Sequence, residues 1–454
     1  MLASSVRWLY IRRVLRLRVT RIVLLLFCLF NLLDVLRIHD HLGRHGHVRR
    51  REAKPSRPHE RVYIASMHFN NGPVLKSHWN QAVLDLTEAF GPDNVFVSVF
   101  ESGSWDDTKD VLRELDRELD RRGVARRVEV SDVTHQDEMD NPDKGEGWVD
   151  TARHKRELRR IPYLAKLRNR TIQDLLDLHD KGVHFDKVLF LNDVVFTVED
   201  VLALMDTNGG DYGAACSLDF SKPPRYYDTF ALRDIEGREH VMQTWPYFRA
   251  RTSRNALVRN MDAVPVTSCW NGMVVMPAEP FVSSTTRLRF RGVPDSLARY
   301  HVEGSECCLI HADNPLSRTR GVYLNPRVRV GYNPAAYEAT HPVSGSWVSA
   351  WDIFRGIWTN RIKRWTSVTL KGLVVESRLR RWKREAKGNQ EPGVFCLINE
   401  MQVLAHNGWA HSYSTKKIHS TCLSNETPAV LTNAHRQTKG HHGIVPERHG
   451  GRNR

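Results

Sequence analysis

The sequence predicts an α/β protein in which helices cover a mostly parallel sheet. Strand-like apolar runs alternate with segments of helical spacing from residue 61 onward, the order typical of parallel sheets. A length of 454 residues is ample for a large hydrophobic core. With 7 cysteines, the chain is not a small domain built on disulfides. We therefore expect a sheet whose strand ends form a ligand edge.

The first half of the body sets this alternation. Expected strands are 62–66, 95–100 and 127–130, and expected helices are 75–90 and a segment from Asp106 to Gly123. Neither a G-x-G-x-x-G after the first strand nor a G-x-x-x-x-G-K-[ST] is present. Without a glycine cradle, a divalent cation held by carboxylates is the usual partner of a diphosphate. Acids at strand ends are therefore the candidates for the site.

The segment 161–191 gives the clearest strand end. A helix with Pro162 in its first turn is expected to run up to Gly182, and the buried strand 187–191 follows. That strand stops at Asn192-Asp193, which places a carboxylate at the ligand edge. The alternative is that Asp193 is only a helix cap or a turn former.

The next acids divide between capping and the site. Thr197 and Asp200 have the spacing of a capping box, so we assign Asp200 to the helix start. A strand at 212–218 is expected to end in Asp219, which is a second candidate at the same edge. The alternative for Asp219 is again a simple turn residue.

Residues 265–315 form a second cluster. A strand at 274–276 is expected behind the turn formed by Trp270, Asn271 and Gly272, and a helix is expected to begin at Ser305. Glu303 and Glu306 would share one side if the chain were already helical there. Glu306 is either an active-site acid or a first-turn residue favoured by the helix dipole.

Metal-ligand spacing is weak elsewhere. His311 and Asp313 could ligate a metal, although such a pair more often lies on the surface. No C-x-x-C or H-E-x-x-H occurs, which argues against a zinc site.

The net charge of +15 belongs to the two ends of the chain. Residues 1–60 carry 13 Lys and Arg against 4 acids, and residues 361–454 carry 17 against 6. The body between them is slightly acidic, whereas a nucleic-acid-binding body would carry a basic stripe. We therefore expect no nucleic-acid partner.

The N-terminus has the pattern of an uncleaved signal anchor. A basic tail at 1–18 precedes an apolar run, and residues 19–36 as a helix would measure roughly 27 Å, enough for an early secretory membrane. The positive-inside rule then places the tail in the cytosol and the body in the lumen. An amphipathic surface helix or a targeting presequence is the alternative.

The expected organisation follows from that anchor. It comprises a cytosolic tail at 1–18, a membrane anchor at 19–38, a stem at 39–60, a catalytic body at 61–411 and a polar basic tail at 412–454, which we expect to be disordered. Six cysteines would be luminal, an even number compatible with an oxidising compartment. The sequence does not give their pairing.

Several long blocks of the body resemble one family. They are ESGSWDDTKD, IPYLAKLRNR, VLFLNDVVFTVEDVL, YYDTFALRDIEGRE, WPYF, SCWNGMVVMPAEPF, RFRGVPDSLARYHVEGSECCLIHADNPLS, NPRVRVGYN and EPGVFCLINEMQVLAHNGWAH. In this order the chain is similar to the fungal capsule-associated α-1,3-mannosyltransferases, which resemble type II Golgi glycosyltransferases.

The resemblance implies a GT-A-like nucleotide-diphospho-sugar transferase fold with a Rossmann-like, mostly parallel sheet. It further implies transfer of mannose from GDP-mannose to a mannose-containing oligosaccharide or polysaccharide, with Mn²⁺ as cofactor, in the Golgi or ER membrane. Where such folds carry Asp-x-Asp, this chain has Leu191-Asn192-Asp193, with a single one of the two carboxylates. Metal dependence therefore needs support from other residues.

The resemblance makes Asp193 the first candidate for the metal and the diphosphate, and Glu306 the candidate acid that faces the acceptor or the anomeric carbon. The other candidates come from the residues themselves. Glu306 and Asp219 are the expected catalytic acids. Asn192, Asp193 and Arg168 are the expected donor-binding residues, Trp270, Asn271 and Glu303 the expected sugar-binding residues, and Asp193 and His311 the expected metal ligands. Arg168 has the alternative of an exposed helix residue. The missing second aspartate leaves one further alternative, a catalytically silent protein that binds glycan and supports polysaccharide export.

Overall fold

The computed structural model describes residues 18–45 and 59–412, apart from 152, 286, 368–369 and 407. Most of three expected segments lies outside the described residues. These parts are 413–454 of the C-terminal tail predicted at 412–454, 1–17 of the basic tail predicted at 1–18, and 46–58 of the stem predicted at 39–60. The positions below refer to the described part of the chain.

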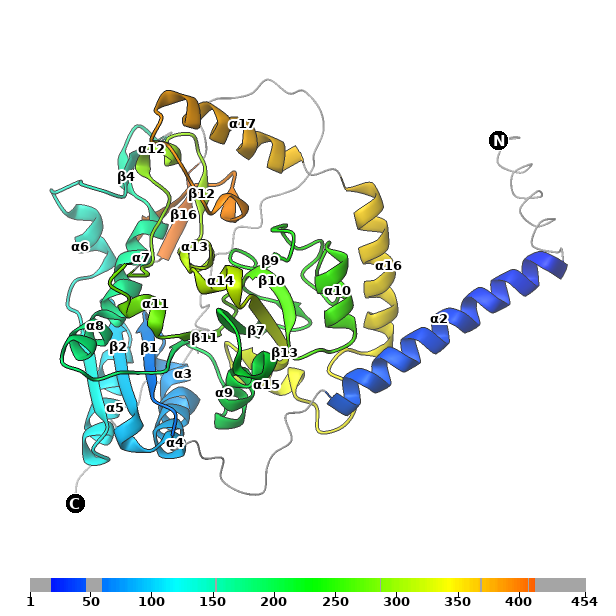
Figure 1. Cartoon of the computed structure of the whole chain (residues 1–454), viewed down its shortest axis with the longest axis horizontal. Coiled ribbons are helices and arrows are strands. Elements are labelled where there is room, and N and C mark those ends of the chain that lie inside the picture. Colours follow the sequence, from blue (N-terminus) through cyan, green and yellow to red (C-terminus); the bar gives the residue numbers. More distant parts are fainter. Residues whose placement is uncertain are drawn as a thin grey trace, which may run out of the picture. The chain divides into compact units, whose positions relative to one another are not determined.

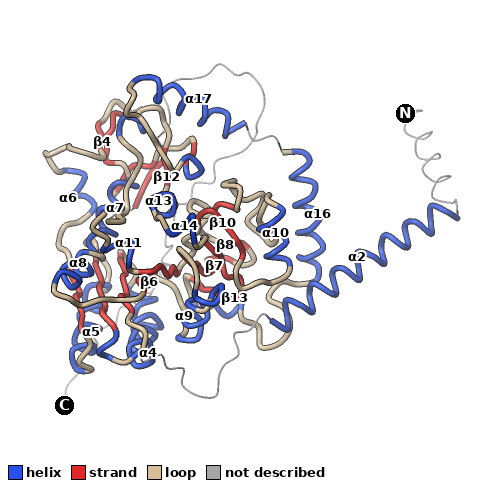
Figure 2. Tube along the Cα trace, in the orientation of Figure 1, coloured by secondary structure: helices blue, strands red, loops and turns tan. Residues whose placement is uncertain are grey.

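The described body is built on a ten-stranded sheet with the order β3-β2-β1-β6-β11-β7-β13-β10-β9, and β8 pairs with β7 (Figure 1, Figure 2). Neighbours are parallel in the pairs β1–β2, β2–β3, β1–β6 and β7–β13, and β11 lies antiparallel between β6 and β7. This mostly parallel sheet confirms the predicted α/β class. Its strands are β1 Val62–His68, β2 Val95–Glu101, β3 Ala125–Val130, β6 Lys187–Leu191, β7 Ala214–Lys222, β8 Arg225–Tyr226, β9 Arg233–Asp234, β10 Val264–Ser268, β11 Met273–Pro277 and β13 Val322–Gly331.

Alternate residues of β1 supply the cores on the two faces of the sheet. Val62 and Ile64 belong to one apolar cluster, whereas Tyr63 and Ala65 belong to the other. Because both faces are buried, residues 62–65 form an unbroken apolar run rather than alternating with polar residues. The helices that bracket the sheet are α3 Gly72–Val74, the π-helical turn Leu75–Trp79, α4 Asn80–Phe90, α5 Thr108–Arg121, α7 Arg160–Thr171, α8 Gln173–Asp180, α9 Val198–Met205, α10 Arg251–Val258, α11 Glu279–Val282, α13 Glu306–Asp313, α14 Leu316–Thr319, α15 Pro334–Thr340 and α16 Ala350–Thr366.

Two predicted boundaries differ from the structure. The single helix expected up to Gly182 is divided into α7 and α8 at Ile172, whose backbone leaves helical geometry. The strand expected to end at Asp219 continues to Lys222, because β7 pairs on with β13 and β8 beyond that residue. The capping box of Thr197 and Asp200 is present at the start of α9, as predicted.

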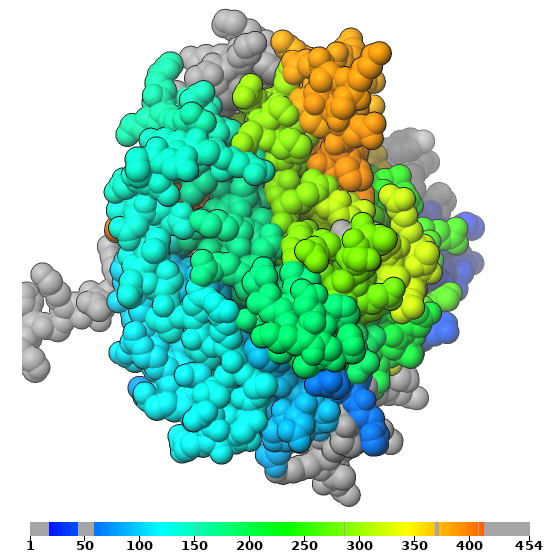
Figure 3. Space-filling model, turned by 60° about the vertical axis from the view of Figure 1, so that its left-hand side comes forward, coloured from blue at the N-terminus to red at the C-terminus, as the bar shows by residue number. Residues whose placement is uncertain are grey.

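A smaller layer lies beside the large sheet. It contains α6 His135–Asp140, β4 Trp148–Asp150, β5 Arg156–Leu158, α12 Asp295–Ala298, β12 Glu303–Gly304, α17 Leu370–Glu385, β14 Leu397–Ile398, β15 Gln402–Ala405 and β16 Gly408–His411. The late helix α17 packs on α12, where the Trp382 indole donates to Ser296 Oγ at 3.1 Å. The space-filling view shows this late segment against residues around 290–310 (Figure 3).

Two disulfides join described cysteines. Cys216 pairs with Cys269, and Cys308 pairs with Cys396. Cys307 is buried and unpaired, and Cys422 lies outside the described residues. The disulfides agree with the expected oxidising compartment.

The N-terminal helix α2 Arg18–His45 is long and apolar enough to cross a membrane, with a mean hydropathy of 2.2 over its best window. It is compatible with a signal anchor or a membrane span. It runs beyond the expected end at residue 38, because Val35, Ile38 and Leu42 are buried in the core of the body. The first residues of the expected stem are therefore helical and packed.

Candidate active site

The ends of β1 and β6 bring Asn71 and Asp193 together. Asp193 follows β6, and its Oδ2 accepts a hydrogen bond from Asn71 Nδ2 at 2.8 Å. Burial raises the pKa of Asp193 to about 6, and the nearby Arg168 opposes this rise. The Asp193 side chain is half-buried at the ligand edge of the sheet, and loss of contact with water is the main cause of its raised pKa.

Asn192 holds the turn that presents Asp193. Its carbonyl accepts from the Trp79 indole at 3.0 Å, and its Oδ1 accepts from the Trp270 indole at 3.1 Å. Its Nδ2 donates to the Tyr332 hydroxyl at 3.2 Å. Because both its amide oxygen and its amide nitrogen are hydrogen-bonded, Asn192 fixes the turn that positions the Asp193 carboxylate.

Asp219 and Asp228 form the second part of the site. Asp219 Oδ1 accepts from Asn271 Nδ2 at 2.9 Å and from the Asp228 backbone N–H at 3.1 Å. Burial and, next, the charge of Asp228 raise the pKa of Asp219 to about 7. Burial also raises the pKa of Asp228. Two carboxyl groups thus share a site that disfavours their joint ionisation.

The turn that carries Asn271 explains why these residues meet. Asn271 and Gly272 both have positive φ angles, of 46° and 90°. A Cβ on Gly272 would lie 2.5 Å from a Val330 side-chain atom and 3.2 Å from the Asp219 Cβ. Glycine is therefore required for the turn to approach β7.

Arg168 is a buried part of the same site and not an exposed helix residue. Its side chain is 12% exposed and its Nε donates to Glu306 Oε1 at 3.1 Å. Its guanidinium lies 4.5 Å from the centre of the Trp270 ring. Glu306 is the first residue of α13, whose N-cap Ser305 accepts from the Cys307 backbone, so the predicted helix start is observed.

Two tyrosines, Tyr332 and Tyr227, lie between Asp193 and the pair formed by Asp219 and Asp228. The Tyr332 hydroxyl donates to Asp219 Oδ2 at 3.3 Å while it accepts from Asn192. The exposed Tyr227 ring lies 4.6 Å from the Tyr332 ring. Burial and then the charges of Asp193 and Asp219 raise the pKa of Tyr227. We call Asp193, Asp219, Asp228 and Glu306 the acidic cluster.

The acidic cluster has the chemistry of a divalent-cation site. Asp193, Asp219 and Asp228 offer carboxylate oxygens, the donors preferred by Mg²⁺ and Mn²⁺. Burial raises the pKa of each of the three, so each is disfavoured as an anion in the absence of a cation. The donor types suit a metal beside a diphosphate. The oxygens of the three aspartates do not all lie within 4.8 Å of one another, since among the described residues the group of three ligand side chains that does is Cys216, Cys269 and His311.

His311 lies elsewhere, against the Cys216–Cys269 disulfide. Its Nε2 donates to the Cys269 carbonyl at 2.6 Å, and burial lowers its pKa to about 4. Although the two sulfurs and His311 are close enough to form a metal cluster, the sulfurs are bonded to each other. Asp313 pairs with Arg291 at 2.6 Å rather than with His311.

Glu303 is held in an ion pair. It is fully buried and pairs with the buried Arg159, whose Nη1 lies 2.9 Å from Oε2. Residues 303–304 form β12 and are not helical, so the expected helical alignment with Glu306 is absent. Arg159 also binds Asp295 at 2.7 Å.

Aromatic side chains follow β1 and β2 at the same edge of the sheet. The Phe69 ring stacks on His135 with 4.0 Å between centroids, and Trp105 stacks on His406 at 4.8 Å. Trp105 is 45% exposed, and its backbone N–H donates to Asn70 Oδ1. The Phe69 and Trp105 rings themselves meet edge to face at 71°, so they form an aromatic patch next to Asn71 rather than one flat surface.

Sequence reasoning missed Asn71, Asp228, Tyr227 and Tyr332. Asn71 and Tyr332 each follow a strand of the sheet, so the strand-end argument could have found them. Asp228 follows the β8 strand in an irregular loop, and nothing in its local pattern marks it as a partner of Asp219.

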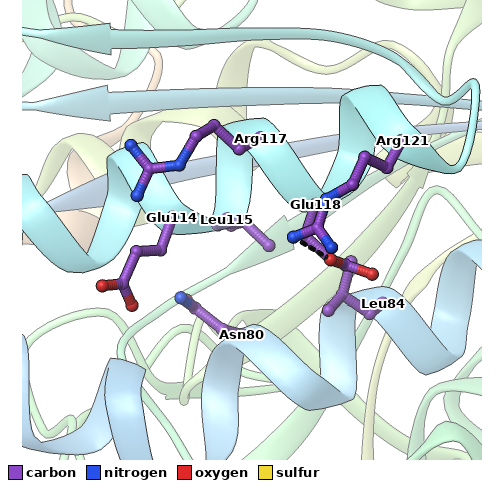
Figure 4. A pocket seen from close by; sticks show the side chains of 7 residues that line it. All are labelled: Asn80, Leu84, Glu114, Leu115, Arg117, Glu118 and Arg121. Carbon is purple, nitrogen blue, oxygen red and sulfur yellow. Dashed lines mark ion pairs between the residues drawn. The ribbon is translucent and has the colours of Figure 1, made fainter.

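A cavity of about 300 Å³ lies between α4 and α5 (Figure 4). Its lining residues are Asn80, Leu84, Glu114, Leu115, Arg117, Glu118 and Arg121. None of them belongs to the acidic cluster. Within this lining, Glu118 forms a salt bridge with Arg121.

Comparison with known proteins identifies relatives of the chain. The family model described as cryptococcal mannosyltransferase 1 matches residues 61–313. No curated protein sequence matches.

Solved structures with similar folds are distant. S. aureus TarS 1–349 in complex with UDP is 10% identical, with a TM-score of 0.31, and the match covers 71% of this chain and 72% of that one. Mannosyltransferase PcManGT from Pyrobaculum calidifontis, in complex with GDP-Man and Mn²⁺, is 10% identical with a TM-score of 0.32, covering 80% and 89%. GalNAc-T7 with UDP, GalNAc and Mn²⁺ is 12% identical with a TM-score of 0.31, covering 60% and 42%.

Proposed function

Because the chain belongs to the cryptococcal mannosyltransferase 1 family and is a glycosyltransferase, we propose that it has a GT-A-like fold and transfers mannose from GDP-mannose. The acceptor is a mannose-containing oligosaccharide or polysaccharide, the bond formed is an α-1,3 linkage, and the pathway is capsule or cell-wall polysaccharide synthesis. The observation that carries this proposal is the acidic cluster with Arg168 at the carboxyl edge of the sheet.

The charges match the reaction. Breaking the sugar–phosphate bond builds positive charge at the anomeric carbon and negative charge on the leaving diphosphate. Arg168 and a cation would stabilise the diphosphate, and carboxylates of the cluster would stabilise the sugar. Since Arg168 is nearly buried and fixed by Glu306 and Trp270, it is preorganised for that task.

Asp193, Asp219 and Asp228 are the residues that would hold Mn²⁺. The bound cation would supply Lewis-acid stabilisation of the departing diphosphate. The sequence Leu191-Asn192-Asp193 has only one of the two carboxylates of an Asp-x-Asp motif. Asp228 would provide the further carboxylate. Asn71 and Asn271 keep two of these carboxylates oriented by their amide hydrogen bonds.

The remaining candidate residues are assigned to binding of the sugar or of the nucleotide. Glu306 at the start of α13 is the proposed acid that faces the reacting sugar, and Trp270 offers a ring beside it. The exposed ring of Trp105, with the edge-to-face Phe69 beside it, is the proposed stacking surface for the guanine base. Glu303 is assigned to positioning, since Arg159 neutralises it in the interior.

Helix α2 is the proposed anchor in the Golgi or ER membrane, with the body in the lumen. The two disulfides support an oxidising lumen as the site of the body.

The test is nucleotide release by the full chain in detergent, from a panel of sugar nucleotides, with Mn²⁺ or EDTA. The full chain is needed because residues 35–42 of α2 contribute to the core of the body. GDP release from GDP-mannose, dependent on Mn²⁺ and lost in Asp193→Asn, is the expected result. If a different sugar nucleotide were the one cleaved, that donor would replace GDP-mannose in the proposal. Nucleotide release that persists in EDTA would contradict the proposed role of the metal.

Asp200→Asn is the matched control, because Asp200 is a buried aspartate that caps α9 rather than lining the site. It is expected to retain release by the folded fraction. If no donor releases nucleotide even with mannose-containing acceptors, while the folded chain binds glycan, the silent glycan-binding protein becomes the better description.

A further inference from the structure

Helix α16 carries an exposed face of tryptophans and cations. Trp351, Trp358 and Trp365 recur at intervals of seven residues, so they lie along one side of the helix. Trp351 is 66% and Trp365 is 72% exposed, and Ile362 on the same side is 51% exposed. We call these four residues the α16 face.

The opposite side of α16 is fixed to the body. Ile353, Gly356 and Asn360 are buried, and Asn360 Nδ2 donates to the Phe248 carbonyl at 3.2 Å. A Cβ on Gly356 would lie 2.3 Å from the Trp245 carbonyl oxygen, which shows how closely the helix approaches. The exposed tryptophans are therefore not a consequence of a loosely placed helix.

The α16 face adjoins the membrane-anchor candidate α2 (Figure 1). The Trp358 indole donates to Asn31 Oδ1 at 2.9 Å, and its ring lies 5.5 Å from the Phe27 ring. From Arg18 to Asn31 the helix rises only about 20 Å, less than the roughly 27 Å of hydrocarbon in an early secretory membrane. A bilayer around α2 must therefore reach the level of Trp358.

Cations lie beside this face and along the side of α16 that packs on the body. Arg361 lies over the Trp358 ring at 4.8 Å, and Arg364 donates to Asn360 Oδ1 at 2.9 Å. Burial, followed by repulsion from Arg361 and Arg249, lowers the pKa of Arg364. Burial, followed by repulsion from Arg364, Arg251 and Arg361, lowers the pKa of Arg254 on α10. These arginines repel one another, and together they form a positively charged region that is complementary to an anionic surface.

We propose that the α16 face and its arginines lie in the headgroup region of the bilayer that holds α2 and bind anionic lipid there. Tryptophan prefers the membrane–water interface, and arginine beside it pairs with lipid phosphate. The body would then have two attachments to the membrane, α2 and α16, which fix its orientation. This inference rests on α2 being a membrane anchor and is independent of the donor.

The experiment places the full chain in lipid nanodiscs that contain brominated phosphatidylcholine, which quenches tryptophans in contact with lipid. Trp351→Phe with Trp365→Phe is expected to reduce the quenched share of the emission to roughly half, because interfacial tryptophans are lost. Trp409→Phe, at a 43% exposed tryptophan of β16, is the matched control and is expected to leave quenching unchanged. Both changes affect exposed side chains, so folding is preserved.

A second arm tests the charge. In discs that contain brominated phosphatidylserine as a minor lipid, the wild-type chain is expected to be quenched beyond the share of that lipid. Arg361→Gln with Arg364→Gln is expected to abolish this excess, whereas Lys383→Gln with Arg384→Gln on α17 is expected to keep it.

Equal quenching in the double tryptophan variant and the wild type would overturn the proposal. A dimer joined through α16 in cross-linking, with no quenching, would assign the face to a second copy of the chain. Loss of the phosphatidylserine excess in both arginine and control variants would also contradict it. None of these results depends on nucleotide release, so failure of the proposed transferase activity is distinguishable.

Discussion

Two groups of buried carboxylates lie in this body, and they differ in how their charge is balanced. Glu303 pairs with Arg159, which is 1% exposed and binds Asp295 as well. Asp219 instead lies beside Asp228, and its pKa is raised to about 7. The first group is neutralised by an arginine of the chain, whereas Asp219 and Asp228 are the residues that we propose bind a cation. This contrast separates an ion pair of the fold from a candidate site better than burial alone.

The largest expected effect is a loss of fold stability when the ion pair between Glu303 and Arg159 is broken. Arg159→Met leaves Glu303 buried without its partner and is expected to lower the free energy of unfolding by about 3–5 kcal/mol. Urea denaturation followed by circular dichroism measures this loss. Arg113→Ala, which breaks an exposed pair with Asp110, is the control with no measurable change.

Adding Glu303→Gln to Arg159→Met is expected to recover part of that loss, because the uncompensated charge is removed. An unchanged midpoint in Arg159→Met would show that the ion pair does not stabilise the fold.

The next effect is on catalysis by the second group. Asp193→Asn is expected to reduce nucleotide release by roughly 10²–10³-fold, the cost of removing one group that stabilises a transition-state charge. Its effect on the unfolding midpoint is expected to be small, because the amide avoids burial of a charge. Asp200→Asn is the control. If it lost nucleotide release to the same extent as Asp193→Asn, misfolding would explain both losses.

The pH dependence of stability distinguishes the groups further. A carboxyl whose folded pKa exceeds its unfolded value makes the fold less stable as pH rises through that window, from about 4 to about 7 for Asp219. Asp219→Asn is therefore expected to gain stability relative to the wild type, by about 2 kcal/mol, between pH 5 and pH 8. Thermal unfolding in EDTA at several pH values measures the difference.

Comparison with the variant is needed because buried histidines titrate in the opposite sense. Burial lowers the pKa of His68, His135 and His311 to about 4, so each adds stability as pH rises. Mn²⁺ is expected to remove the advantage of Asp219→Asn at pH 8. A pH-independent difference between variant and wild type would contradict the raised pKa.

The smallest effect concerns how Arg168 is held. Arg168→Lys keeps the charge but loses the planar contact with Trp270, and is expected to reduce release by about tenfold. The Michaelis constant for the donor is expected to rise with little change in stability. Arg117→Lys, which lines the cavity between α4 and α5, is the control.

The sequence by itself determined the order of strands and helices and the position of Asp193. Both follow from local chemistry: β6 is an apolar run that ends at Asn192, and a parallel strand must expose its end at the ligand edge. The capping of α9 by Asp200 and the start of α13 at Ser305 are equally local, since each needs only neighbours within one helical turn.

Tertiary structure alone decided which acids act together. Asp228 meets Asp219 through a bent loop, and Arg168 is covered by Glu306 from a segment far along the chain. It likewise gave Glu303 its arginine and placed α16 against α2. A sequence pattern records the period of one element, whereas charge balance depends on groups brought together from distant elements, and that balance separates the ion pair of the fold from the acidic cluster.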